Sequence, residues 1–423
     1  MTARSGAGVV KEILPNGLRV IIEPLREFSS VSMGIWILTG SRDEKTSQSG
    51  ISHLIEHLAF KGTSRRTAKQ IALEIDSLGG SLNAFTSKEF TSFYARVLGE
   101  SLSQSMDVLT DITLNSVFAA EELSKEKDVI LQEISMVEDT PDDLIHDLHC
   151  QEFWADQSLG RPILGTQNSL MSVKRDHVMD FHTNRYRAGQ MILTASGDLE
   201  PDRFLSEVKD SAFGDLEKGD LPAERAYARA TPGICVRNRP VEQVHCCVGH
   251  EGFAADDERR YVMYLLNSVL GGGMSSRLFQ KIREEYGLAY SVFSYHSAYQ
   301  DTGMHTVYCG TSVDGFPKTL EIIREETHRL AEEKVLDVEL ETCKRQLKGN
   351  LLLGLESTGN RMNQLARNEI YSGRHITPEE IGAGIEAVTT DDIRDLASIL
   401  FQKNPAITVI GPVSEAEVHE IVG

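Results

Sequence analysis

The stretch His53-Leu54-Ile55-Glu56-His57 carries the strongest structural signal in this chain. His53 and His57 are four residues apart, so on an α-helix their side chains project from the same face, one turn apart. The surrounding sequence fits a helix, because residues 51–58 carry an apolar face opposite the histidines and Gly62 can end the helix. The stretch therefore predicts a helix that presents two imidazoles and one carboxylate together.

Two imidazoles with a glutamate beside them are typical of a zinc site. Histidine is a common zinc ligand, and Glu56 can reach a water on the metal without being a ligand itself. The order H-x-x-E-H reverses the H-E-x-x-H motif of many zinc peptidases. Paired helical histidines can also be hydrogen-bonded core groups or hold a structural metal, so the motif alone leaves these alternatives open. A third ligand would discriminate, because catalytic zinc has three protein ligands and one open position.

A candidate third ligand lies on a second predicted helix. Residues 119–139 contain few helix breakers and an apolar stripe, which predicts one long helix. Glu126 and Glu133 are seven residues apart, about two turns, and share the face that borders this stripe. A carboxylate near a core needs a partner or a metal, which makes Glu133 a candidate ligand and Glu126 a supporting carboxylate. Alternatively, both are solvated residues of a charged helix, and periodicity does not decide between the two interpretations.

Taken together, these residues resemble the pitrilysin (inverzincin) family of zinc metallopeptidases. The similarity is to its short-chain branch, which includes the mitochondrial processing peptidase β subunit and its bacterial homologues, and it extends over essentially the whole chain. It implies that one zinc ion per chain is bound by His53, His57 and Glu133. It also implies that Glu56 is the general base and that Glu126 supports the catalytic site.

The sequence also contains an internal repeat. Residues 191–197 and 406–411 are apolar strand-like stretches that end at glycine and precede a helical segment. Between the halves, residues 215–232 are rich in charge with Gly and Pro, which is typical of a linker. We therefore expect an α+β fold with two homologous domains, a catalytic zinc-binding domain at 1–214 and a domain without metal at 233–423. The resemblance implies that such a chain is one half of a clamshell-type peptidase.

A possible peptide-binding strand follows the first helices. Residues 81–87 alternate with strand period, and an exposed edge strand near a zinc site can bind an extended peptide through its backbone. In the resembling family, the segment that matches Asn83, Ala84 and Phe85 is this substrate-binding edge. Without the resemblance, core residues and a turn residue are the simpler interpretation.

In the second half, Arg283 and Tyr290 are seven residues apart. The resemblance implies that they contact the substrate and the developing oxyanion, which peptide hydrolysis must stabilise. The alternative is a surface helix residue and a strand core residue. Residues 271–273 are three glycines, but the phosphate-loop interpretation is weak because no GK[ST] follows.

The resemblance also predicts an assembly. Longer members of the family join two such two-domain units around a chamber, with the zinc site in the first unit and the Arg-Tyr pair in the second. This chain has one unit and carries both sets. We therefore expect a homodimer in which Arg283 and Tyr290 of one subunit complete the zinc site of the other, in trans.

Composition limits the other possibilities. With 423 residues, 40% hydrophobic and 25% charged, the chain is long enough for two globular domains. It has no apolar run of membrane-spanning length, and its formal charge of −20 argues against a nucleic-acid partner. The first eight residues lack the apolar core of a signal peptide, so a cytoplasmic location is expected. The cysteines show no disulfide spacing, and the remaining histidines, His250 among them, are expected to be structural.

From these observations we predict a zinc-dependent endopeptidase. Its substrates would be peptides or unfolded, presequence-like segments, hydrolysed by a metal-activated water with Glu56 as general base. The alternative is a non-catalytic binding or assembly subunit of the same family.

Overall fold

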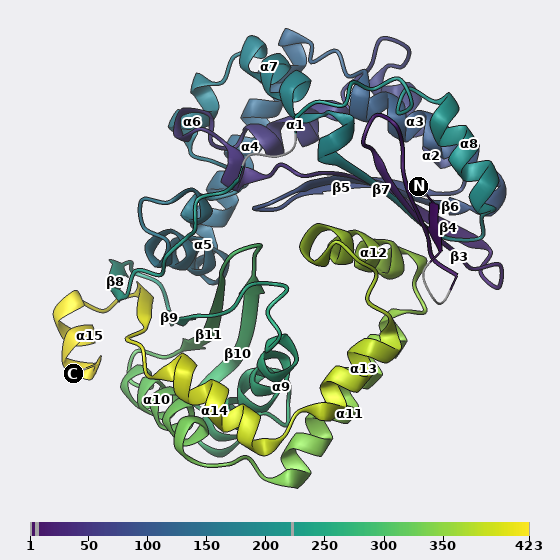
Figure 1. Cartoon of the computed structure of the whole chain (residues 1–423). Coiled ribbons are helices and arrows are strands. Elements are labelled where there is room, and N and C mark those ends of the chain that lie inside the picture. Colours follow the sequence, from purple (N-terminus) through teal and green to yellow (C-terminus); the bar gives the residue numbers. More distant parts are fainter. Residues whose placement is uncertain (1, 5–7, 221–223, 423) are drawn as a thin grey trace. The chain divides into compact units, whose positions relative to one another are not determined.

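The structure, a computed structural model, describes residues 2–4, 8–220 and 224–422 (Figure 1). The chain forms two compact units. Unit 1 comprises Met1–Ser135, Arg161–Arg225 and Leu353–Ile376, and unit 2 comprises Met136–Gly160, Ala226–Leu352 and Thr377–Gly423.

Unit 1 is built on a seven-stranded sheet with the order β1-β2-β3-β7-β4-β6-β5. Neighbouring strands are antiparallel except β3 and β7, which run parallel. The strands are β1 (Thr2–Arg4), β2 (Val10–Ile13), β3 (Arg19–Pro24), β4 (Ser30–Ile37), β5 (Ser81–Thr86), β6 (Thr91–Leu98) and β7 (Met191–Gly197).

Helices cover both faces of this sheet (Figure 1). They are α1 (Ile51–Ala59), α2 (Ala68–Ser77), α3 (Leu102–Leu114), α4 (Ala120–Asp139), α6 (Gln167–Ser172), α7 (Arg175–Arg185), α8 (Pro201–Asp210) and α12 (Thr358–Ser372). Successive side chains of a strand point to opposite faces, so Ile35 packs with α1 and α3 in the main core, whereas Trp36 packs with Met362 and Leu365 of α12. Helices on both faces explain why β4 and β7 are buried along almost their whole length.

Unit 2 is built on a five-stranded sheet with the order β10-β11-β9-β12-β8, antiparallel except for the β12–β8 pair. Its strands are β8 (Gly233–Asn238), β9 (Val244–Glu251), β10 (Ala289–Ala298), β11 (Gly303–Thr311) and β12 (Ala406–Gly411). Its helices are α5 (Pro141–Phe153), α9 (Arg260–Gly271), the π-helix η6 (Phe279–Glu285), α10 (Phe316–Glu332), α11 (Asp337–Gly354), α13 (Pro378–Ala387), α14 (Thr390–Phe401) and α15 (Glu415–Val422). Short 3-10 turns complete the chain at η1 (Ser41–Asp43), η2 (Thr46–Gln48), η3 (Gly99–Ser101), η4 (Ser158–Gly160) and η5 (Ala188–Gln190).

The two sheets share one topology. Five strands of unit 1, in the order β3-β7-β4-β6-β5, match the order β8-β12-β9-β11-β10 of unit 2, and the single parallel pair stands at the same place in both. The chain therefore has the expected α+β fold of two related domains. The glycine triplet at 271–273 follows helix α9 rather than a strand, which removes the strand–loop–helix setting of a phosphate loop.

Each half of the chain contributes one helix to the other half's sheet. Helix α12, from late in the sequence, packs on β4 and β7 in unit 1, and α5, from early in the sequence, packs on β9 and β12 in unit 2. The packing units thus differ from the predicted segments 1–214 and 233–423 at these two helices. The division into homologous halves along the sequence stays a prediction.

The predicted linker at 215–232 lies partly outside the described residues, at 221–223. Its first part is attached to unit 1, because the carbonyl groups of Glu217 and Lys218 accept hydrogen bonds from the backbone of Ala188 and Gly189.

The six cysteines lie within residues 8–220 and 224–422, and all are free thiols. Five of them are buried and Cys235 is half-buried.

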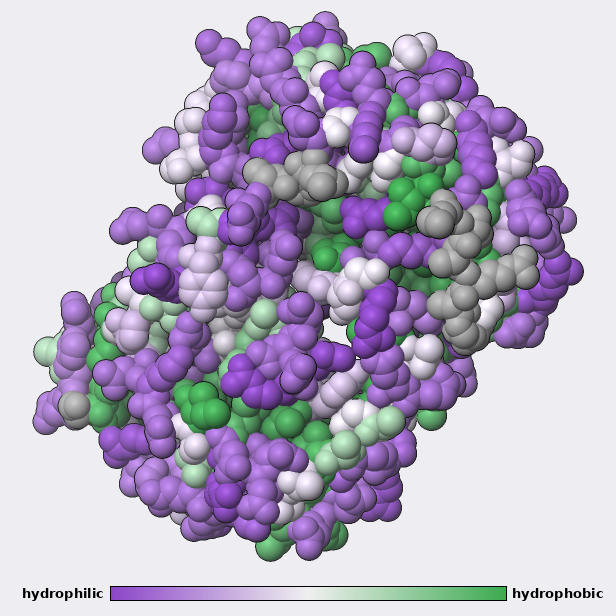
Figure 2. Space-filling view, in the orientation of Figure 1, coloured by the Kyte–Doolittle hydropathy of each residue, from purple (hydrophilic) through white to green (hydrophobic). Residues whose placement is uncertain are grey.

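The surface shown in Figure 2 is mostly hydrophilic, with small apolar patches. Within the described part of the chain, no helix combines the length and apolar composition that a membrane crossing requires.

Candidate metal centre

Helix α1 forms because its apolar face fits the core of unit 1. Ile51, Leu54, Ile55 and Leu58 are at most 1% exposed and pack in that core, which leaves the opposite face to the polar residues. The helix begins after Gly50, whose φ of +93° lies in the left-handed region that favours glycine.

The carboxylate of Glu44 fixes the start of α1. Its two oxygens accept hydrogen bonds from the backbone N–H groups of Gly50 and Ser52, at 2.7 and 2.8 Å. These donors belong to the first turn of the helix, where backbone N–H groups have no partner within the helix. Glu44 therefore anchors the first turn of the helix that carries the H-x-x-E-H stretch.

Helix α4 places two carboxylates beside α1. Leu123 and Ile130 of α4 are buried in the same core, so the neighbouring face of the helix meets the polar face of α1. Glu126 is 4% exposed, whereas the Glu133 side chain is 36% exposed. The structure thus brings both predicted glutamates to the histidines.

Three side chains form a cluster that could hold a metal. The His53 Nε2 and His57 Nε2 atoms lie 3.8 and 3.7 Å from the two carboxylate oxygens of Glu133. One ligand atom from each residue lies within 4.8 Å of the others, and no second cluster of this kind occurs among the described residues. A tetrahedral zinc ion with bonds of about 2.0–2.1 Å separates its ligand atoms by roughly 3.3 Å, so a small inward movement would suffice.

The surroundings of the two histidines suit a cation. His57 Nδ1 lies 3.1 Å from the carboxylate of Glu126, which accepts hydrogen bonds, so this contact favours the tautomer with the proton on Nδ1 and the lone pair of Nε2 facing Glu133. Burial, with a contribution from His57, lowers the pKa of His53 to about 4, so this imidazole is neutral near pH 7. Two imidazoles and one carboxylate are a ligand set of catalytic zinc sites, and these residues fit the metal.

Glu56 lies on the same face of α1 but is not one of the three residues of the metal cluster. The Thr86 hydroxyl donates a hydrogen bond of 2.5 Å to its carboxylate. Burial raises the pKa of Glu56, and the Thr86 hydrogen bond and His57 oppose that shift. A half-buried carboxylate with a raised pKa beside a metal cluster is suited to accept and return a proton.

Glu126 has two partners. One oxygen faces His57, and the other forms an ion pair with Lys61 Nζ at 2.8 Å. A buried carboxylate that is paired on both sides can hold an imidazole in one tautomer and orientation.

The segment Asn83-Ala84-Phe85 lies in β5, at the end of the sheet order of unit 1. Its outer edge has no strand neighbour among the described residues, and its end at Thr86 reaches Glu56. The Phe85 ring packs edge-on against Trp36 at 5.7 Å between centroids, so this side chain is also a structural group. Asn83 lies within the strand, so the alternative that it is a turn residue is wrong, and the substrate-binding role of the segment stays a prediction.

Arg283 and Tyr290 lie together in unit 2. The Arg283 guanidinium stacks over the Tyr290 ring at 4.5 Å and Nη1 donates to the Tyr290 carbonyl oxygen at 3.2 Å. Tyr290 is 79% exposed on β10, so the alternative that it is a strand core residue is wrong. The segment that carries Arg283 is a π-helix, a rare element that is frequent at functional sites.

Sequence reasoning missed three residues around the cluster, namely Glu44, Lys61 and Thr86. Thr86 lies in the predicted strand stretch, directly after Phe85, and Lys61 lies one turn after His57, so position alone offered a weak signal for both. Their partners are distant in sequence and became apparent only in the fold.

Comparisons with known proteins agree with this geometry. Residues 19–167 match the family model described as insulinase (peptidase family M16), and residues 172–347 match the model described as peptidase M16 inactive domain. The H-x-x-E-H stretch lies in the first segment and has no counterpart in the second.

Two relatives are similar over almost their full length. A protein of Bacillus subtilis named an uncharacterized zinc protease is 42% identical over 94% of this chain and 97% of the relative. One of Streptomyces coelicolor, with the same description, is 38% identical over 98% of this chain and 92% of the relative.

Solved structures show the same fold. A peptidase M16 inactive domain from Pseudomonas fluorescens has a TM-score of 0.90 at 19% identity and covers 96% of this chain and 98% of its own. A protease from Helicobacter pylori has a TM-score of 0.88 at 20% identity and covers 96% of this chain and 99% of its own. The family models and the zinc protease relatives confirm the resemblance to the pitrilysin family: the chain belongs to peptidase family M16.

Proposed function

We propose that this chain is a zinc-dependent endopeptidase that hydrolyses peptides or unfolded, presequence-like segments. The observation that carries the proposal is the cluster of His53, His57 and Glu133, with Glu56 beside it on the same helix. The relatives that are named zinc proteases support the peptidase part.

One zinc ion per chain, held by the cluster, would supply a Lewis acid that makes water a nucleophile near neutral pH. Glu56 would take the proton of that water and deliver it to the leaving amine. The Thr86 hydroxyl would hold the Glu56 carboxylate in place, and Glu126 would fix the tautomer of His57.

The free edge of β5 would bind the substrate. Backbone N–H and C=O groups of Asn83, Ala84 and Phe85 can pair with an extended peptide, and such pairing tolerates many side chains. This mode suits unfolded segments, because a folded protein rarely offers a free strand.

Arg283 and Tyr290 would stabilise the negative charge that develops on the scissile carbonyl oxygen. The exposed Tyr290 hydroxyl, oriented by the stacked Arg283, supports this role. We further propose a homodimer in which these two residues complete the partner's zinc site in trans, since one chain carries both sets. The cytoplasmic location stays a prediction.

The test uses a quenched fluorogenic basic peptide and the variant Glu56→Gln. We expect hydrolysis to fall by about 10²–10⁴-fold while the zinc content stays at one ion per chain, as measured by elemental analysis. Glu27→Gln, an exposed residue of unit 1, is the matched control and should keep full activity. Wild-type turnover in Glu56→Gln would refute the mechanism.

A chelator arm separates the two candidate functions. Removal of metal should abolish cleavage, and added zinc should restore it. No chelator-sensitive cleavage across a broad panel of peptides would favour the non-catalytic binding or assembly subunit.

A further inference from the structure

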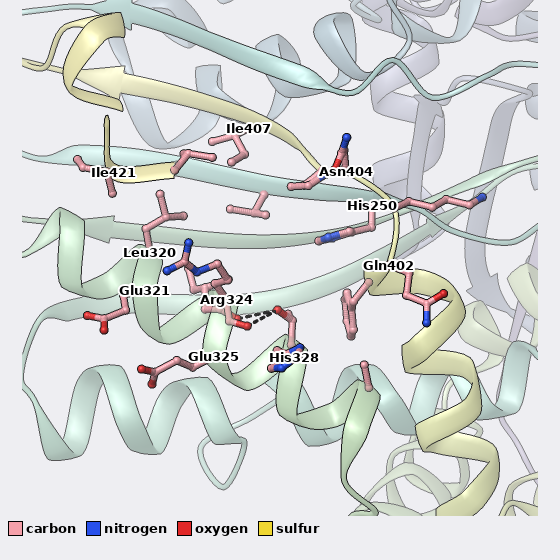
Figure 3. A pocket seen from close by; sticks show the side chains of 18 of the residues that line it. His250, Leu320, Glu321, Arg324, Glu325, His328, Gln402, Asn404, Ile407 and Ile421 are labelled. Carbon is pink, nitrogen blue, oxygen red and sulfur yellow. Dashed lines mark hydrogen bonds between the residues drawn. The ribbon is translucent and has the colours of Figure 1, made fainter. Parts of the chain in front are cut away.

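Unit 2 contains a cavity of about 710 Å³ that lies far along the chain from the metal cluster (Figure 3). It lies between the helix α10 and the sheet strands β9 and β12, and residues of α15 and of the turn after α14 close it. Layers of a helix and a sheet normally pack without space of this size. The volume falls within the range of sites for small molecules, about 300–1,000 Å³.

The cavity has an apolar floor. Val248 and Ile407 from the sheet, and Leu320 and Ile323 from α10, all line it and are at most 7% exposed. Ile421 and Phe401 extend the apolar lining towards the rim. Such a lining favours a ligand with a hydrocarbon body, because burial of apolar surface on both partners drives binding.

One polar side chain stands in this apolar floor. His250 of β9 is 5% exposed, and its Nδ1 is buried without a hydrogen-bond partner among the described residues. Figure 3 shows its ring reaching from the strand into the cavity, and Phe401 packs edge-on against it at 5.0 Å. An unsatisfied buried polar atom is costly, and a ligand atom that pairs with it would relieve that cost. The sequence-based prediction that His250 is merely structural does not account for this position.

Most of the charged side chains at the rim of the cavity form ion pairs, and one does not. The rim acids and Lys403 have partners in ion pairs, namely Glu321 with Lys318, Glu325 with Lys281, Glu332 with His328, and Lys403 with Glu251. Arg324 also lines the cavity, yet its guanidinium forms no ion pair or side-chain hydrogen bond with any residue that the structure describes. Figure 3 shows this side chain extending from α10 towards the sheet. The rim therefore offers one unpaired cation, which suits an anionic group.

We propose that this cavity binds a small apolar molecule with a terminal carboxylate, which pairs with Arg324 while the hydrocarbon body covers the floor. Two sources share this chemistry, a free fatty acid and the C-terminal end of a short apolar peptide. The peptide differs in one respect, because its amide can also hydrogen-bond His250. The proposal is independent of the zinc site and of catalysis.

Isothermal titration calorimetry with the whole chain tests the proposal. The probes are decanoate and N-acetyl-Leu-Leu, each with its uncharged counterpart, decanol and N-acetyl-Leu-Leu amide. We expect saturable binding of at least one acid, about tenfold or more tighter than its uncharged counterpart. Tighter binding of the peptide acid than of decanoate identifies a peptide end as the source, and the reverse order identifies a fatty acid.

Two variants locate the binding in the cavity. Arg324→Gln should weaken the acid about tenfold or more and leave its uncharged counterpart unchanged. Ala331→Phe, which fills the lining of α10, should weaken the acid and its counterpart alike. Arg345→Gln, an exposed arginine of α11 outside the cavity, is the charge control and should bind as the wild type does.

Three outcomes would overturn the proposal. They are no binding of either acid by the wild type, equal affinity for acids and uncharged counterparts, and binding that Arg324→Gln leaves intact. Circular dichroism shows whether Ala331→Phe folds. If this variant does not fold, Arg324→Gln, which changes an exposed side chain, still decides the test.

Discussion

His57 and Glu126 are joined through Nδ1 and one carboxylate oxygen, 3.1 Å apart, and this contact determines which ring nitrogen of His57 is free. The Nε2 atom then faces Glu133 at 3.7 Å, on the side where the proposed metal would bind. Glu126, which is outside the proposed ligand set, would thus orient the proposed ligand His57.

Loss of this contact should weaken metal binding. In Glu126→Ala we expect zinc affinity to fall by about 10–100-fold, because the His57 ring loses its orienting partner. Competition with a chromogenic chelator measures the affinity. Glu121→Gln, an exposed residue in the first turn of the same helix, should bind zinc as the wild type does. Unchanged affinity in Glu126→Ala would show that the contact is incidental.

Thr86 should act on catalysis without contact to the metal. Thr86→Val keeps the shape of the side chain but removes the hydroxyl that donates to Glu56. We expect kcat to fall about tenfold, equivalent to about 1.4 kcal/mol, with KM and zinc content unchanged. Thr86→Ser restores the hydroxyl and should recover most of the rate. Equal loss in the Ser and Val variants would instead indicate a packing role.

Subunit exchange tests the trans assignment of Arg283 and Tyr290. Glu56→Gln and Tyr290→Phe chains should each be inactive alone and regain activity after mixing, because a mixed dimer holds one intact composite site. At equal mixing, half of the dimers are mixed and each has one good site of two, so activity should approach about a quarter of wild type. Native mass spectrometry verifies the mixed dimer. A verified mixed dimer without activity would mean that both sets act within one chain.

Glu44 should make stability depend on pH. Burial raises the pKa of this carboxyl from 4.5 to about 7, against the backbone hydrogen bonds from Ser52 and Gly50. The folded chain then holds the proton more tightly, so the contribution of protonated Glu44 is complete below about pH 4.5 and is lost as pH rises through about 7.

The variant Glu44→Gln isolates this effect. A shift of this size corresponds to about 3 kcal/mol between the two ends of that pH range, and the glutamine cannot titrate. Urea unfolding at pH 4.5 and pH 8, with a chelator present to exclude metal effects, should therefore show a smaller loss of stability in the variant. Parallel pH dependence of the variant and the wild type would contradict the raised pKa.

The local parts of this protein follow from sequence because helix geometry is local. Residues four apart share a helix face whatever surrounds them, so the alignment of His53 with His57 could be predicted from spacing. The same holds for Glu126 and Glu133 on α4. The similar order of strand-like and helical stretches in both halves likewise predicted two related α+β domains, which the matching sheet orders confirm.

Only the tertiary structure decided which of these faces meet. The pairing of α1 with α4 depends on how their apolar stripes share one core, and it brings Lys61 to Glu126. The fold also brings Thr86 of β5 to Glu56, and Glu44 to the first turn of α1, from positions without a motif. The exchange of α5 and α12 between the sheets, and the cavity beside His250, also escaped prediction. An apolar helix face fits several sheet faces equally well by pattern, and the packing of the whole chain selects one of them.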